Sequence, residues 1–551
     1  MNKKSFSVAC LVLAMFVLSA QMLLAQSYLK SPKVAKNSSN TPQEINLNTS
    51  KFKQVLYLIA NGYLDSSNVN NLTEEAIKKV VAELDPHSSY IPAKDVQAME
   101  EPLVGNFEGI GIEYALINDT LTVQSVIADG PSEKAGLKAG DKINTVDGEV
   151  ISGTGLTTQR VIKYLRGPKG TKVRVGYIRR GMGENEVVIT RDKIPVNTVD
   201  CVYEPSEGIL FIRITRFGAE TYKEFMSAVE NYTSGQYEKD KRFKGLIVDL
   251  RSNGGGYLSA AQRIANEFLS KGNLILYAEG RSVERIDSYA DGSGKLQNIP
   301  LAILIDESSA SASEIVSGAV QDWDRGFIVG RRSFGKGLVE QEYTLVDGSR
   351  LRLTIARYHT PSGRVIQTPY IQGDKDEYAK KYVTRLLSEE RFNKDSIKTD
   401  PSLEYRTLKL KRKVYGGGGI IPDEFIPIDT TYYSAPYLKS VNSGAFSEFV
   451  QSYADLHRDN ITKRYKNAQD CIENFKVDDN FFNEYLEDSK KRGIEYAQKD
   501  LELSKENICK QLKGLVIRNI YGLDNYLIFI NRTDENVLKA IELLRSHATL
   551  N

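Results

Sequence analysis

The hydrophobic positions in the middle of the chain come in short continuous runs. These runs cover 208–214, 245–250, 301–306 and 326–330. Segments with helical periodicity follow the first two runs, and a further helix is expected shortly after the third. Short, uniformly apolar strands that alternate with helices are typical of a largely parallel sheet with both faces covered. The pattern therefore predicts an α/β domain.

The pattern is different on both sides of this domain. Between 103 and 194, short strand-like runs are separated by glycine-containing turns, with one amphipathic helix at 157–166. Upstream, 50–64 and 72–84 have helical periodicity. Downstream, 436–551 reads as a series of amphipathic helices rich in Lys, Glu, Tyr and Asn. We therefore expect a β-rich domain before the α/β domain and helical regions at both ends.

The first residues have the features of a secretory signal peptide. Lys3 and Lys4 precede a continuous apolar run, and cleavage is predicted after Ala25. Because Leu23 occupies the outer position of the usual small-x-small site, an uncleaved N-terminal anchor is the alternative. No later segment has 18 or more consecutive apolar residues, so no further membrane span is expected.

Composition and charge argue against several classes of function. The formal net charge is only +2, and there is no basic block with interleaved aromatic residues, so nucleic acid is not expected as a partner. Cleavage after Ala25 leaves Cys201, Cys471 and Cys509, too few for a disulfide framework, and a pairing of the last two is left open. Four histidines without metal-binding spacing make a metal site improbable.

Two polar segments follow apolar strands. In parallel sheets, ligands bind at the carboxyl ends of the strands, which is where these segments lie. One is "ESSASASEIVSGAV" at 307–320, and the other is "DLRSNGGGY" at 249–257. Ser311 and Glu314 have the spacing of a helix capping box, which is the ordinary interpretation of the first segment. The other interpretation is that a serine there performs chemistry. A helix that begins at the end of a strand presents such a serine into a crevice.

A serine hydroxyl needs a base to accept its proton, and a lysine in a tightly packed setting is one solution. His87 and His359 are more typical of structural histidines, whereas Lys336 is enclosed by two glycines in "RRSFGKGLVEQEY". A serine acylation site also needs N–H donors for the oxyanion. Ala312 at the helix start and a glycine of "NGGG", taken as Gly255, are the candidates.

Together these motifs resemble the carboxyl-terminal processing (tail-specific) proteases, serine peptidases with a Ser/Lys dyad. The matching motifs occur in the family's order over about 75–430: "LDPHSSYIP", "GIGIE", "GPSEKAGLKAGDKINTVDG", "DLRSNGGGYL", "SASASEI", "FGKG", "YHTPSGRVIQ" and "GGGGIIPD". The resemblance implies that Ser311 is the nucleophile and Lys336 the general base. It also implies a crotonase-like, ββα-type α/β core and no metal or organic cofactor.

One position departs from the family pattern. The family usually has Gln four residues after the lysine, where it orients the base, but this chain has Glu340 followed by Gln341. Neighbours on a strand point to opposite faces, so Gln341 replaces the family residue only if the register shifts or a bulge intervenes. A carboxylate beside Lys336 favours its charged form and weakens the base. Either Glu340 is protonated, or the register is shifted, or activity is reduced.

The region 103–194 resembles a PDZ domain inserted before the protease core. Such domains bind a peptide as an added strand and hold its terminal carboxylate with backbone N–H groups of a glycine-containing loop. The resemblance assigns that loop to Gly109, Ile110, Gly111 and Ile112, and the side-chain pocket to Val161 and Leu165. The alternative for the helix positions is that they only pack the domain.

These observations give one main hypothesis. We expect an exported serine endopeptidase in the bacterial periplasm or cell envelope that cleaves polypeptides near free C-termini, with the PDZ domain selecting the tail. Two alternatives are a catalytically weak or silent PDZ-containing scaffold on the same fold and an exported non-proteolytic hydrolase. The C-terminal helices are candidates for contact with a second copy or an adaptor. The expected regions are a signal peptide (1–25), a linker with N-terminal helices (26–102), the PDZ domain (103–194), the protease core (195–435) and the C-terminal helices (436–551).

Overall fold

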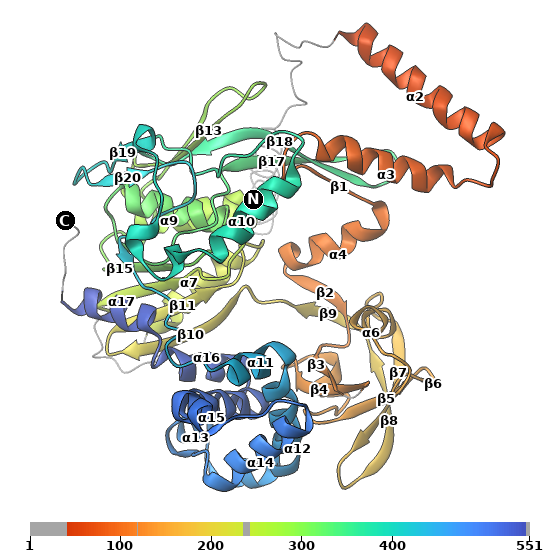
Figure 1. The fold of residues 1–551 in the computed structure, drawn as a ribbon, viewed down its shortest axis with the longest axis vertical. Helices are drawn as coiled ribbons and strands as arrows, with labels where there is room; N and C mark the ends of the chain where they lie inside the picture. Colours follow the sequence, from red (N-terminus) through yellow and green to blue (C-terminus); the bar gives the residue numbers. More distant parts are fainter. Residues whose placement is uncertain (1–40, 118, 235–242, 547–551) are drawn as a thin grey trace, which may run out of the picture.

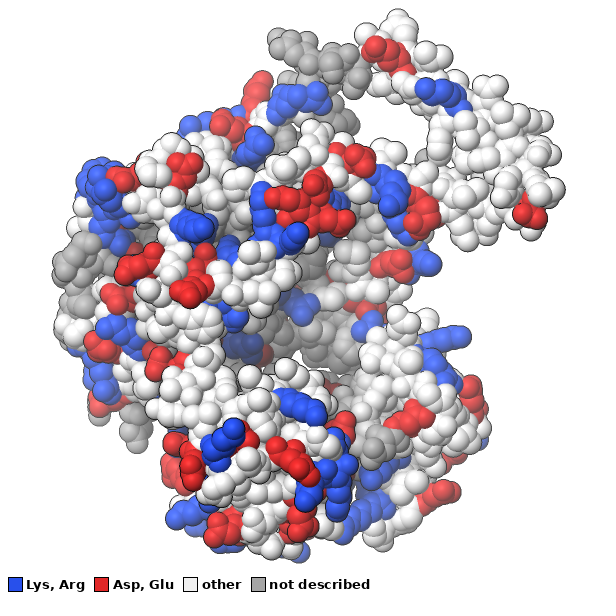
Figure 2. Space-filling model, viewed as in Figure 1, with Lys and Arg blue, Asp and Glu red and all other residues white. Residues whose placement is uncertain are grey.

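A computed structural model describes residues 41–117, 119–234 and 243–546. The expected signal peptide at 1–25 lies outside the described residues. Within them, every helix is too short or too polar to cross a membrane. Basic and acidic side chains are interspersed over the face shown in Figure 2.

The predicted α/β sheet has six strands. Their order is β10 (Val199–Ser206), β11 (Ile209–Ile214), β12 (Gly245–Asp249), β15 (Leu301–Ile305), β16 (Phe327–Gly330) and β21 (Glu424–Phe425). Only β10 is antiparallel to its neighbour, so the carboxyl ends of the other strands lie at one edge. The intervening helices are α7 (Thr221–Thr233), α8 (Leu258–Phe268) and α9 (Ala312–Asp322). The predicted parallel arrangement is confirmed.

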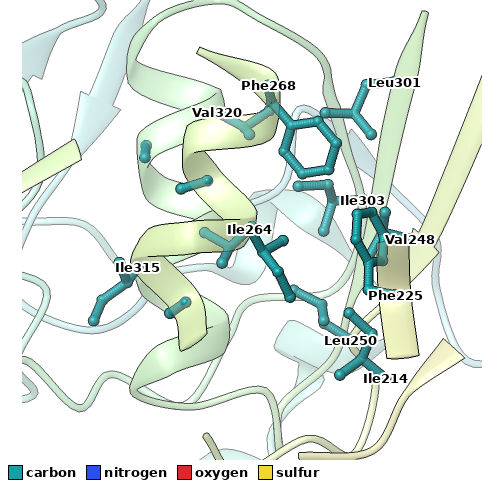
Figure 3. Packing of buried hydrophobic residues seen from close by; sticks show 14 of the residues in the cluster. Ile214, Phe225, Val248, Leu250, Ile264, Phe268, Leu301, Ile303, Ile315 and Val320 are labelled. Carbon is teal, nitrogen blue, oxygen red and sulfur yellow. The ribbon is translucent and has the colours of Figure 1, made fainter. Parts of the chain in front are cut away.

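Both faces of this sheet are covered. On one face, α7, α8 and α9 pack on alternate strand residues in a single cluster, part of which is shown in Figure 3. On the other face, Ile247, Leu304 and Val329 pack against α16 (Leu523–Asn531) and α17 (Glu535–Arg545). Successive residues of a strand point to opposite faces of the sheet. Because both faces are covered, every residue of β12 and β15 is buried.

The sequence analysis missed a second, antiparallel sheet. It is formed by β1 (Ser89–Ile91), β18 (Arg350–His359), β13 (Leu274–Glu279) and β14 (Ile286–Tyr289), with β17 (Leu338–Thr344) also paired to β18. Helix α9 contacts β13 of this sheet and β16 of the parallel sheet, so it lies between the two. The crotonase-like description of the core stays a prediction.

The β-rich region forms a separate sheet of six strands. Its order is β3 (Ile112–Ile117), β4 (Thr120–Val126), β5 (Lys142–Val146), β7 (Lys172–Arg179) and β8 (Gly183–Thr190), with β6 (Glu149–Val150) beside β5. The two helices of this region are α5 (Pro131–Lys134) and α6 (Thr158–Leu165). A separate ladder of β2 (Asn106–Gly109) and β9 (Asp192–Pro195) brings together the two chain segments that enter and leave the region.

The remaining helices lie at the two ends of the chain and after β18. At the N-terminal end, α2 (Pro42–Gly62), which has no buried residue, and α3 (Val69–Ala82) extend from the body in Figure 1, and α4 (Ala93–Val104) follows. After β18 come α10 (Lys375–Leu386), the 3-10 turns Glu389–Arg391, Lys394–Ser396 and Pro401–Leu403, and the hairpin β19 (Glu404–Arg406) and β20 (Lys413–Tyr415).

The C-terminal helices form their own hydrophobic core before the chain reaches α16 and α17. They are α11 (Ala435–Ser443), α12 (Ala445–Arg464), α13 (Ala468–Asn474), α14 (Asp479–Lys491) and α15 (Gln498–Tyr521). Cys471 and Cys509 are both free thiols in the structure, so they do not form the disulfide that the sequence left open. Arg180 of the β-rich region donates to the Asp455 carbonyl in α12 (3.1 Å). The helices thus contact other parts of the same chain, and the expected contact with a second copy or adaptor stays a prediction.

Candidate active site

The structure distinguishes the serines of the segment between β15 and α9. The Ser309 hydroxyl donates to the Leu250 carbonyl (2.8 Å), and the Ser313 hydroxyl donates to the Asn253 carbonyl (2.9 Å). Both side chains are buried, and they join this segment to the glycine-rich loop after β12. Ser308 is exposed, and Ser311 is partly buried at the start of α9. Ser311 is therefore the serine whose position at the strand end suits chemistry.

Ser311 has an unusual backbone conformation. It is the N-cap residue of α9, with φ 55° and ψ −111°. A positive φ in a non-glycine residue costs of order 1–3 kcal/mol and persists only where the surroundings impose it. Here Glu314 reaches back to the Ser311 backbone N–H (2.8 Å), as the predicted capping box requires. The cap and the strained backbone together fix where the Ser311 side chain begins.

Glu314 does more than cap a helix. Its side chain is fully buried, and besides Ser311 it accepts hydrogen bonds from the Ser333 hydroxyl (2.6 Å) and the backbone N–H groups of Gly335 (2.7 Å) and Lys336 (2.9 Å). The N–H groups of Ser311 and Lys336 donate to the same oxygen, Oε2. Burial raises the pKa of the Glu314 carboxyl, and the four donors oppose that effect. One carboxyl group thus holds the Ser311 and Lys336 backbones side by side.

Two further side chains, which the sequence analysis did not single out, fix the same two loops. The Tyr358 hydroxyl lies 2.7 Å from the Lys336 carbonyl oxygen and 3.3 Å from that of Ser311. Burial raises the pKa of Tyr358 well above its usual value, so the hydroxyl remains neutral. Gln367 accepts from the Gly337 N–H (2.8 Å). "YHTPSGRVIQ" contains both residues, but its sequence gave no sign of these contacts.

Lys336 lies in the tightly packed turn that its flanking glycines predicted. Gly335 has φ +93°, and a Cβ there would lie 2.4 Å from the Thr368 hydroxyl, so only glycine fits. The Lys336 ammonium nitrogen lies 2.8 Å from Oε1 of Glu340, and both side chains are largely buried. Glu340, the residue that departs from the family pattern, therefore contacts Lys336 directly.

Gln341 does not take the place of Glu340. A register irregularity does occur in the β17–β18 ladder, because Val339 pairs with Ala356 while Glu340 pairs with Thr354. The extra residue is on β18, so alternation along β17 is preserved and Gln341 points to the opposite face. There its side chain accepts from the Tyr343 hydroxyl (3.0 Å). Of the two candidates for orienting the lysine, Glu340 is the one in contact with it.

The oxyanion assignment is partly corrected. Gly255 does approach the serine: with φ +102°, a Cβ there would lie 2.8 Å from the Ser311 Cβ and 3.1 Å from the Ala312 nitrogen. Its N–H, however, already donates to the Asn253 side chain (2.9 Å). Among the described residues, the N–H groups of Ala312 and Gly254 have no acceptor. Ala312 thus keeps a free donor at the helix start, and Gly254 rather than Gly255 has the second.

His87 lies next to this site in the turn before β1. Asp85 accepts from the His87 and Ser88 N–H groups (both 2.8 Å) and from the Thr354 hydroxyl (3.0 Å), opposite Glu340 on β18. The buried Nε2 of His87 has no hydrogen-bond partner among the described residues. Burial and the neighbouring Lys336 charge lower the pKa of His87 from 6.5 to about 4. The imidazole is therefore neutral at physiological pH.

The loop expected to bind a carboxylate connects β2 and β3. Gly109 ends β2 and Ile112 begins β3, and the N–H groups of Ile110 and Gly111 between them have no acceptor within the described ranges. β3 is an edge strand, and no described strand pairs with its outer side. An added peptide strand would therefore find both a free edge and free donors.

The helix positions expected to line a side-chain pocket belong to the domain core. Val161 and Leu165 on α6 are buried, with 1% and 5% of their surface exposed. Packing, the alternative interpretation, accounts for the amphipathic pattern of α6. The contact of these residues with a bound peptide stays a prediction.

The lowered pKa of His87 predicts a change in how stability depends on pH. An unfolded chain binds the imidazole proton below about pH 6.5, whereas the folded protein binds it only near pH 4. Wild-type stability should therefore fall as the pH drops from 6.5 to 4, by on the order of 2 kcal/mol from this group alone. His87→Gln should remove that part of the fall in Tm. His457→Gln in α12 is the control, and parallel Tm–pH curves for wild type and His87→Gln would contradict the assignment.

Comparison with known proteins identifies three regions of the chain. Residues 208–376 match peptidase family S41, and residues 122–179 match the PDZ domain family. Residues 437–522, which cover most of α11 to α15, match a family of unknown function.

Several relatives cover much of the chain. It is 35% identical to a carboxy-terminal-processing protease of Bartonella bacilliformis over 65% of this chain and 79% of that protein. It is 31% identical to a probable CtpA-like serine protease of Staphylococcus epidermidis over 74% of this chain and 79% of that protein. Among solved structures, the photosystem II D1 C-terminal processing protease is 28% identical, with a TM-score of 0.33 over 59% of this chain and 86% of that chain. The chain belongs to peptidase family S41 and is a serine-type carboxy-terminal-processing peptidase with a PDZ domain.

Proposed function

We propose that this peptidase is an exported endopeptidase that uses Ser311 as nucleophile and Lys336 as general base, and that its PDZ domain selects substrates by their C-terminal tails. The observation that carries the catalytic assignment is the shared Glu314 oxygen, which accepts from the backbone N–H groups of both residues. A nucleophile and a base must be held in one geometry, and rigid positioning of this kind is a large part of catalytic rate.

The reaction proceeds through an acyl-enzyme. The Ser311 hydroxyl oxygen attacks the carbonyl carbon of the scissile peptide, and its proton passes to the Lys336 amine. The resulting ammonium then gives that proton to the departing amine nitrogen as the C–N bond breaks. Water attacks the Ser311 ester, Lys336 accepts one water proton, and that proton returns to the serine oxygen when the ester bond breaks.

The N–H groups of Ala312 and Gly254 stabilise the negative oxygen of the tetrahedral intermediate. Both lack an acceptor within the described part of the chain, and Ala312 begins α9, whose N-terminal dipole also favours negative charge. Asn253 supports this arrangement. Its side chain accepts from Gly255 and donates to the Ile214 carbonyl (2.8 Å), so the loop that carries Gly254 is fixed to the sheet.

Lys336 must lose a proton before it can act as a base, and Glu340 is the acceptor that the site offers. In the free enzyme the two form an ion pair at 2.8 Å. A substrate that covers the site excludes water, and an ion pair out of water carries a desolvation penalty. Transfer of one proton from the ammonium to the carboxylate then yields a neutral amine beside a neutral carboxylic acid. The ion pair is also the one observation that favours the alternative, a weak or silent binding protein.

The PDZ domain supplies selectivity for tails. The free N–H groups of Ile110 and Gly111 suit a terminal carboxylate, and the free edge of β3 suits the extended chain before it. Both recognise main-chain atoms. With Val161 and Leu165 buried in the core, discrimination among side chains requires α6 to move when a peptide binds.

Export is proposed from the basic start and the apolar run before Ala25. The mature protein then functions in the periplasm or cell envelope. N-terminal sequencing of the protein from membrane and soluble fractions of the cells that make it should give Gln26 as the first residue. A protein that retains Met1 and sediments with membranes would instead support the uncleaved anchor.

Cleavage of matched peptides tests the dyad and the role of the PDZ domain together. Peptides of one unstructured, apolar-tailed sequence are made with free or amidated C-termini. Wild type should cleave the free form faster, and Ser311→Ala and Lys336→Ala should each lower kcat by about 10⁴-fold or more. Ser308→Ala, an exposed neighbour in the same segment, is the control and should retain wild-type activity.

The same peptides distinguish the other functions. A scaffold would bind the free form without cleaving it, and a hydrolase of another class would treat both forms alike. A third outcome is that wild type cleaves both forms at equal rates while Ser311→Ala and Lys336→Ala still lower kcat. That result would refute tail selection by the PDZ domain, and the assignment of Ser311 and Lys336 would stand.

Replacing Glu340 tests whether its ion pair restrains the base. If that ion pair holds Lys336 before substrate binds, Glu340→Gln should raise kcat/KM at pH 7 by roughly tenfold. The control is Glu342→Gln, an exposed residue on the same strand that pairs with Arg352. A loss of activity in Glu340→Gln alone would mean that the carboxylate is needed and that the proposed restraint on the base is wrong.

A further inference from the structure

A polar cavity of about 440 Å³ lies beside the proposed catalytic lysine and has no role in the reaction described above. Its lining comes from the turn before β1, from β18 and from the segment after it: Leu84, Arg357, Val365, Gln367, Pro369, Tyr370 and Gln372. The strands β17, which begins two residues after Lys336, and β18, which carries Arg357, run side by side near α3 in Figure 1. Arg357 is the charged residue of this lining.

The cavity is connected to the site through the β17–β18 ladder. Arg357 is the register partner of Leu338, two residues after Lys336. Positions 338 and 340 of β17 share one face by strand alternation, and Lys336, two residues before the strand, contacts Glu340 on that face. Arg357, opposite Leu338, lies on that face. Two residues of strand span roughly 7 Å, so the cavity is within one or two substrate residues of the lysine.

Gln367 gives a second, direct connection. Its side-chain oxygen accepts from the N–H of Gly337, the residue after Lys336, and the same side chain lines the cavity. The side-chain nitrogen donates to the Thr368 carbonyl (3.0 Å). The wall of the cavity is thus fixed to the backbone that positions the base.

Arg357 differs from the other arginines of its strand. Arg350 pairs with Glu100 and Arg352 pairs with Glu342. Arg357 is exposed and forms no ion pair within the described residues. Its neighbour across the sheet, Glu279, has its carboxylate at His359 instead (3.4 Å). The guanidinium therefore remains available to a ligand.

We propose that this cavity is a substrate subsite that binds a carboxylate close to the scissile bond, with Arg357 as the residue that determines this preference. A guanidinium offers a planar set of donors that matches a carboxylate, and no acidic side chain lines the cavity to compete with it. The inference rests on the proposed function, because it places the scissile bond at Ser311. Two sources supply this group: an Asp or Glu side chain, or the terminal carboxylate of a short tail.

Binding measurements test the subsite without requiring turnover. The probes are amidated, apolar decapeptides in which one Glu or one Gln is moved along the sequence, and neutral peptides with free or amidated C-termini. Full-length Ser311→Ala should bind the best-placed Glu peptide, or the free C-terminus, about five- to tenfold more tightly than its neutral partner. Ser311→Ala/Arg357→Gln should lose the difference between Glu and Gln peptides, or reduce the preference for the free C-terminus to the part that the PDZ domain contributes. The pair whose difference changes with Arg357→Gln identifies the source of the carboxylate.

Reversing the charge separates recognition from a structural effect. In the Ser311→Ala protein, adding Arg357→Glu should shift the preference from Glu to Lys at the same peptide position, which a merely misfolded cavity would not do. Arg352→Gln on the same strand is the control and should keep the wild-type preference. Equal affinity for Glu and Gln peptides at every position, together with a free-terminus preference that Arg357→Gln leaves unchanged, would overturn the proposal, and so would the same loss in Arg352→Gln.

Cleavage by the enzyme with Ser311 intact gives an independent outcome. An active enzyme whose kcat/KM shows no carboxylate preference sensitive to Arg357 would refute the subsite and leave the proposed function standing. An enzyme that cleaves no peptide although Ser311→Ala shows the Arg357-dependent preference would refute the proposed function and leave the binding site.

Discussion

The buried carboxyl group of Glu314 is the contact on which the rest of the site depends. Ser311 and Lys336 come from different segments, after β15 and after β16. Glu314, in the first turn of α9, accepts one hydrogen bond from the Ser311 backbone and three from the segment that carries Lys336. A carboxyl group can accept several hydrogen bonds at once, and a fully buried one needs them to offset the lost solvation. The same contacts therefore supply the hydrogen bonds that the buried Glu314 carboxyl needs and align the backbones of Ser311 and Lys336.

The parallel sheet makes this contact possible. Because β12, β15 and β16 are parallel neighbours, the loops after them meet at one edge: the glycine-rich loop, the serine segment and the lysine turn. The helices α16 and α17 cover the face of the sheet away from α7, α8 and α9. The C-terminal region is thus part of the support for the catalytic edge as well as a neighbour of the PDZ domain.

Much of this arrangement could be predicted from the sequence, and the exceptions have physical causes. The buried parallel strands are uniformly apolar, so the sheet and the position of Ser311 at a strand end could be predicted. The second sheet was missed because most residues of β14 are exposed and most of β17 are only partly buried or exposed, so both resemble surface segments. Glu314 was identified only as a cap, since its bonds to the loop around Lys336 join residues about 20 positions apart. Gly255 was chosen over Gly254 because a sequence does not show which N–H the Asn253 side chain occupies.

The ion pair of Lys336 with Glu340 changes what the active site requires from its substrate. An amide at this position would orient the lysine without favouring its charge, whereas the carboxylate stabilises the ammonium while the site is wet. In the proposed mechanism, this ion pair must be given up before Lys336 can accept the Ser311 proton. A substrate that fills the crevice removes water from both groups, and the neutral pair becomes the less costly state. The proposed mechanism thereby links catalytic competence to occupancy: the chain that excludes water is also the chain to be cut.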